Sequence, residues 1–80
     1  MKWDLEWDTA AEEGMKHFPS WQDAARLCRA MMIFAETGEG DVRRVGQGPE
    51  YRLHAGSYVA RFGIDASTET ITVWTVFRKR

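Results

Sequence analysis

The chain has 80 residues, a formal net charge of −1 and a hydrophobic content of 44%. This length excludes several domains, so residues 1–80 are expected to form a single domain. The single cysteine excludes an internal disulfide, and no apolar run approaches the roughly 20 residues of a membrane-spanning helix. Since no secretory leader opens the chain either, we expect a cytoplasmic protein.

The N-terminal residues predict a strand and a first helix. Lys2–Asp8 alternates between polar and apolar residues, which is typical of a strand with one buried face. Thr9 and Glu12 have the spacing of a capping box, and Pro19 ends the helix that they begin.

A second helix is predicted from Ser20 to about Glu36, with Asp23 completing a looser capping box. Its expected buried face is wide, with Leu27 and Phe34 broadening it. That face consists of Trp21, Ala24, Ala25, Cys28, Met31, Met32 and Ala35. The Gly-containing residues 37–41 then predict a loop.

Three strands are predicted in the second half, at Tyr51–Ala55, Tyr58–Asp65 and Thr70–Phe77. Gly56-Ser57 suits a two-residue turn between the first two, because glycine at the first turn position fits type II′. The order β-α-α-β-β-β predicts an α+β fold in which both helices pack on one face of an antiparallel-rich, four-stranded sheet.

Counting from that turn places Arg52 directly opposite Arg61 and puts His54 on the same face. Like charges opposite each other cost stability, so an anion over the pair is expected. His54 could exchange protons near neutral pH. The opposite face would be core, with Tyr51, Leu53, Ala55, Tyr58, Ala60 and Phe62. The alternative is an ordinary solvent-facing sheet surface.

Charge is divided unevenly along the chain. Residues 1–41 hold nine acids and four bases, whereas residues 42–80 hold seven bases and three acids. This asymmetry favours an anionic partner for the second half. His17 fits a helix end and Cys28 a helix core better than catalysis. Neither a metal nor another cofactor is predicted, because no ligand spacing or phosphate-loop context is present.

Residues 48–65, which read GPEYRLHAGSYVARFGID, resemble the RelE/ParE toxin superfamily. Members typically read Tyr-Arg-Leu-Arg, a short turn, and Tyr-Arg-Val-x-Tyr/Phe-x-Ile/Val-Asp. The last strand and its Arg78-Lys79-Arg80 ending also match in position. With the first strand and two helices, the resemblance covers almost the whole chain and implies a RelE-like fold.

The resemblance implies the toxin of a bacterial toxin–antitoxin pair, which cleaves mRNA on the ribosome and is neutralised by a cognate antitoxin. In this reaction the RNA 2′-hydroxyl attacks its own phosphate. Arg52 and Arg61 would bind the phosphate, His54 would transfer a proton, and Lys79 would support the transition state. The other predicted RNA-binding residues are Arg43, Arg44, Arg78 and Arg80.

Two departures from the family pattern keep other functions open. Val59 stands where nucleases of the family have their central catalytic arginine, and the sequence ends before their C-terminal tyrosine. These departures fit a ParE-like protein that inhibits DNA gyrase without being an enzyme. They also fit a decayed toxin that only binds its antitoxin.

Overall fold

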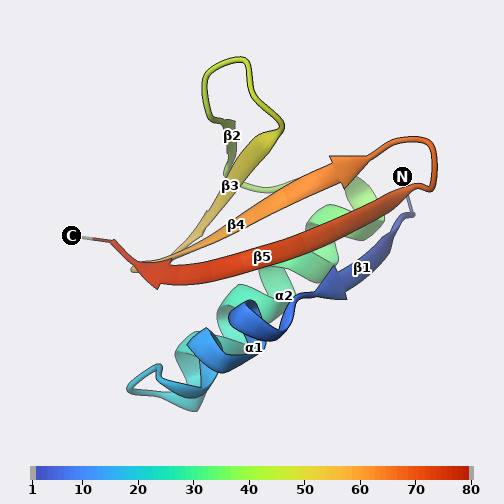
Figure 1. Cartoon of the computed structure of the whole chain (residues 1–80). Coiled ribbons are helices and arrows are strands. Elements are labelled where there is room, and N and C mark those ends of the chain that lie inside the picture. Colours follow the sequence, from blue (N-terminus) through green and yellow to red (C-terminus); the bar gives the residue numbers. More distant parts are fainter. Residues whose placement is uncertain (1, 80) are drawn as a thin grey trace.

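The computed structural model describes residues 2–79, which form two helices and one mixed sheet of five strands (Figure 1). The elements are β1 (Asp4–Trp7), α1 (Thr9–Lys16), α2 (Trp21–Thr37), β2 (Val42–Arg44), β3 (Glu50–Ala55), β4 (Tyr58–Asp65) and β5 (Thr70–Arg78). The predicted α+β fold is confirmed. The sheet has one strand more than predicted, because the three-residue β2 lies within a stretch that was assigned to no element.

The strand order is β1-β5-β4-β3-β2. β1 pairs with β5 in parallel, and the other neighbours are antiparallel. Both helices lie on the same side of this sheet, with α1 against β5 and α2 against β1, β3 and β4 (Figure 1). The other face of the sheet carries no helix. No helix within residues 2–79 is long and apolar enough to cross a membrane.

The two helices begin at different kinds of cap. The predicted Thr9 cap is wrong, since the first helical residue is Thr9 and its cap is Asp8, whose side chain makes no capping hydrogen bond. The Ser20 cap of α2 is confirmed, because the hydroxyl of Ser20 accepts a hydrogen bond from the backbone N–H of Gln22. At its other end, α2 stops at Gly38, which adopts a left-handed conformation with φ of 80°.

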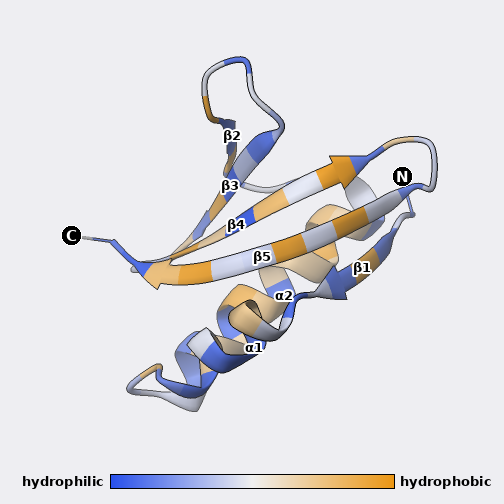
Figure 2. Cartoon of the chain, viewed as in Figure 1, coloured by the Kyte–Doolittle hydropathy of each residue, from blue (hydrophilic) through white to orange (hydrophobic). Residues whose placement is uncertain are grey.

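The core lies between the helices and the sheet and contains buried hydrophobic residues from both layers. Figure 2 marks the hydrophobic residues of the helices and strands along the ribbon. Phe62 on β4 is fully buried, and its ring lies 5.4 Å from that of Phe34 on α2. The predicted buried face of α2 is partly wrong. Trp21 is 78% exposed and Met32 is 51% exposed. The buried residues of α2 are Leu27, Met31, Phe34 and Ala35.

The β3–β4 hairpin has the register that was predicted by counting from its turn. Ala55 pairs with Tyr58, and Arg52 pairs with Arg61. Gly56 has a φ of 60°, which the first position of a type II′ turn requires. The predicted core face of the hairpin is confirmed as well, because its residues are buried or half-buried.

Candidate functional site

Three arginines stand side by side on the face of the sheet that the helices leave open. Arg43 on β2 pairs with Arg52 on β3, and Arg52 pairs with Arg61 on β4. Directly paired residues point to the same face. We call Arg43, Arg52 and Arg61 the arginine row. The sequence predicted its central pair, and β2 adds the third member.

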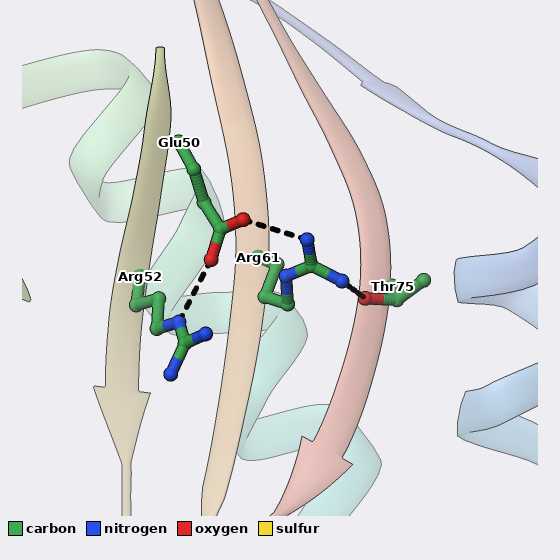
Figure 3. A network of polar contacts seen from close by, with 4 residues as sticks. All are labelled: Glu50, Arg52, Arg61 and Thr75. Atoms are coloured by element: carbon green, nitrogen blue, oxygen red, sulfur yellow. Dashed lines mark hydrogen bonds and ion pairs between the residues drawn. The ribbon is translucent and has the colours of Figure 1, made fainter. Parts of the chain in front are cut away.

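A carboxylate of the protein itself bridges two members of the arginine row (Figure 3). One oxygen of Glu50 lies 2.9 Å from Nε of Arg52, and the other lies 2.6 Å from NH2 of Arg61. Arg61 also donates a 3.5 Å hydrogen bond to the hydroxyl of Thr75 on β5. The anion expected over the two arginines is therefore Glu50.

The electrostatics of this bridge favour the charged form of Glu50. Hydrogen bonds from Arg61 and Arg52 lower the pKa of Glu50 from 4.5 to about 2. The same contact with Glu50 raises the pKa of Arg61. The two guanidinium groups thus hold an ionised carboxylate at neutral pH. They form a clamp for an anion with two oxygens, a geometry that a phosphate group can also satisfy.

His54 lies on the same face, two residues along β3 from Arg52. Burial lowers the pKa of His54 below its ordinary value of 6.5, and the positive charges of Arg43 and Lys79 lower it further. His54 is therefore neutral at physiological pH, which is the form that can accept a proton. Its Nδ1 atom is buried and makes no hydrogen bond within residues 2–79.

An apolar patch separates His54 from β5. Val59 pairs with His54 on one side and with Phe77 on the other, and only 1% of its surface is exposed. The guanidinium of Arg52 lies over the Phe77 ring, 5.5 Å from its centroid. Val59, which the resemblance aligned with the central arginine of nucleases in the RelE/ParE superfamily, is therefore a covered residue.

The structure brings together most of the predicted site residues. Arg52, Arg61 and His54 share the open face, and Arg43 and Lys79 are close enough to affect the pKa of His54. Arg43 is also held by Asp41, 3.4 Å from its Nε.

Two of the predicted RNA-binding arginines point elsewhere. Arg44 pairs with Tyr51 and Arg78 pairs with Tyr58, so both belong to the helix-covered face. Arg44 donates to the carbonyl groups of Gln47 and Gly48 and so holds the β2–β3 loop. Arg80 lies outside the described residues.

Glu50 is the site residue that the sequence analysis missed. A signal was available, because Glu50 lies two residues before Arg52 and alternation puts both on one face. Within residues 2–79, no group of three His, Cys, Asp or Glu side chains is placed to hold a metal ion. The site thus offers cations, one carboxylate and one neutral imidazole.

The chain was compared with protein-family models, with curated proteins and with solved structures. No protein-family model matches the sequence, and no curated protein matches it either.

Solved structures do match, among them several toxin–antitoxin complexes and the isolated RelE toxin from E. coli. A chain of the archaeal RelE–RelB complex from Pyrococcus horikoshii has a TM-score of 0.81 at 15% identity, over 99% of this chain and 97% of that one. A chain of the E. coli RelBE complex has a TM-score of 0.76 at 15% identity, over 98% of each of the two chains. A chain of the RelB–RelE complex from Methanococcus jannaschii has a TM-score of 0.72 at 16% identity, over 91% of this chain and 88% of that one. The chain therefore has a RelE-like fold.

Proposed function

We propose that this protein is the toxin of a toxin–antitoxin pair and that it cleaves mRNA bound to the ribosome. One observation carries the proposal: a RelE-like fold presents two clamped arginines and a neutral histidine on its helix-free face. Several of the solved structures with this fold are complexes of RelE with RelB, which supports an antitoxin as the partner.

The chemistry follows from the residues on the open face. A substrate phosphate would take the place of the Glu50 carboxylate between Arg52 and Arg61. His54 would accept the proton of the RNA 2′-hydroxyl as this oxygen bonds to phosphorus. The bond from phosphorus to the 5′-oxygen then breaks, and the leaving oxygen takes a proton from solvent water, which gives a 2′,3′-cyclic phosphate and a 5′-hydroxyl. Both arginines and Lys79 would stabilise the charge that builds up on the phosphate oxygens.

Two features of the site require movement before the reaction. Glu50 occupies the clamp, and the Nε atom of Arg61 and the Nδ1 atom of His54 are buried without a partner within residues 2–79. A substrate would reach these atoms only after side chains shift. Binding of the RNA phosphate would displace Glu50 from the clamp, and the ribosome would supply the further free energy that positions the 2′-hydroxyl at His54. Free RNA would therefore bind but be a poor substrate.

The test is to add the purified protein to ribosomes programmed with a defined mRNA and to map breaks by primer extension. We expect cuts at the A-site codon from the wild type and none from the Arg52→Ala/Arg61→Ala variant. Arg26→Ala/Arg29→Ala is the matched control, because it removes two arginines of α2 that lie outside this face. Cutting by the Arg52→Ala/Arg61→Ala variant at the wild-type rate would overturn the assignment.

A second candidate is a toxin that inhibits DNA gyrase without enzymatic activity. The covered Val59 favours it, because the position of the family's catalytic arginine cannot contribute a charge. A folded wild-type protein that cuts no ribosome-bound mRNA but causes DNA-damage signalling in arrested cells would establish this function. Normal growth on expression without an antitoxin would instead indicate a decayed toxin.

A further inference from the structure

Trp74 lies beside the arginine clamp in an unusual position. Along β4 and β5, Arg61 pairs with Thr75, whereas the next residue Phe62 pairs with Val73. Trp74 is thus the extra residue of a β-bulge. Bulges re-aim side chains, and this one turns both Trp74 and Thr75 toward the open face of the sheet.

The Trp74 ring packs against the backbone of Gly63, which has no side chain. A Cβ atom at Gly63 would come within 2.4 Å of Cζ2 of Trp74, so the indole rests directly on this glycine. Gly63 is paired with Glu50, the residue that holds the two arginines. Neighbouring strands are only about 4.8 Å apart, so the ring lies one strand spacing from the clamp.

A shallow cavity of about 210 Å³ opens at this ring. Its walls are Pro49, Gly63, Ile64, Asp65, Thr72 and Trp74. The only charged wall residue is Asp65, and its carboxylate accepts hydrogen bonds from Ser67 and Thr68. The cavity, which we call the slot, is therefore mostly apolar and lies next to a clamp for an anion.

We propose that this slot binds one unstacked nucleobase of a single-stranded RNA, with Trp74 as the stacking surface. A nucleotide joins a flat base to a phosphate, and the slot and the clamp offer matching sites on the same face. An aromatic ring stacks on any base, so the slot would be tolerant of sequence. This inference rests on the proposed function and adds the part of the substrate that the tryptophan recognises.

The test measures binding of a fluorescently labelled RNA hexamer by anisotropy. Stacking energies of about 1–3 kcal/mol per base correspond to about 5- to 150-fold in affinity. We therefore expect Trp74→Leu to weaken binding within that range, whereas Trp74→Phe retains most of the affinity. Trp21→Leu is the matched control, because Trp21 is an exposed tryptophan on α2. It should leave binding unchanged.

Two further readouts distinguish stacking from a structural role of Trp74. In a series of hexamers that each lack the base at one position, one member should bind the wild type more weakly than the complete hexamer does. The same member and the complete hexamer should bind Trp74→Leu equally well. The salt dependence should also differ. Trp74→Leu should keep the wild-type slope of log affinity against log salt, whereas Arg52→Ala/Arg61→Ala should reduce it by roughly 0.7 per lost phosphate contact.

The outcomes separate this inference from the proposed function. A wild type that does not bind the hexamer, or a folded Trp74→Leu variant that binds it equally well, would overturn the stacking site. If Trp74→Leu fails to fold, the base-deleted hexamers and Trp74→Phe still decide the question. Trp74-dependent binding without any cleavage on the ribosome would leave the stacking site standing and remove the nuclease.

Discussion

The two faces of the sheet use the same strands for different purposes. On the helix-covered face, Leu53 and Phe62 are fully buried and apolar. On the open face, their chain neighbours His54 and Arg61 are partly exposed and carry the candidate chemistry. Because side chains alternate along a strand, every residue of the β3–β4 hairpin belongs to one face or the other. Burial thus holds the hairpin in place, and the hairpin in turn fixes the spacing of the arginine clamp.

The largest expected effect comes from breaking the covered face. Phe62→Ala removes a fully buried ring that packs against Phe34 and Tyr51. Such substitutions cost about 3–5 kcal/mol, which is most of the stability of a domain this small. We expect a large drop in the urea midpoint by circular dichroism. Arg61→Ala, one residue away, should cause a much smaller drop. Equal losses for the two variants would contradict the division between the faces.

The covered face could be predicted from the sequence to a useful extent. Period-two alternation located four of the five strands, and the Gly56-Ser57 turn fixed the pairing of Arg52 with Arg61. The helical pattern was less informative, because α2 has more apolar residues than it buries. Trp21, the first residue of α2, follows the same spacing as the core residues but is exposed.

The open face was harder to predict, because its contacts depend on how side chains reach across strands. β2 has a single apolar residue, Val42, so no alternation could reveal it. Because β2 was not predicted, Arg43 could not be placed beside Arg52 from the sequence. Alternation along β3 puts Glu50 on the same face as Arg52. Its ion pairs with Arg52 and Arg61, however, depend on the side-chain conformations of these long residues, which alternation does not determine.

A smaller effect tests whether Glu50 is held by the clamp. Its pKa is about 2 in the folded protein and about 4.5 when unperturbed. A lowered carboxyl pKa stabilises the fold above the unperturbed value, and this stabilisation is lost as the pH falls toward the folded value. Wild type should therefore have a higher urea midpoint than Glu50→Gln at pH 6, with a difference that shrinks between pH 4.5 and 2.

Glu39→Gln is the control for this measurement, because Glu39 is an exposed carboxylate without an ion pair among residues 2–79. Its midpoint should follow that of the wild type throughout the acid range. A difference between wild type and Glu50→Gln that stays constant down to pH 2 would mean that the carboxylate is not bound by the arginines in solution.

The smallest effect concerns His54 on the open face, whose pKa depends on nearby charges. Burial and the nearby Arg43 and Lys79 lower its pKa below 6.5. The NMR titration midpoint of His54 should therefore lie below that value. Arg43→Ala or Lys79→Ala should raise the midpoint, because removing a positive charge makes protonation easier. Arg29→Ala on α2 should leave it in place. A midpoint above 6.5 would contradict the lowered pKa. A midpoint well above neutral pH would mean that His54 is largely charged, and it would then fit a proton donor better than the proton acceptor that the proposed reaction needs.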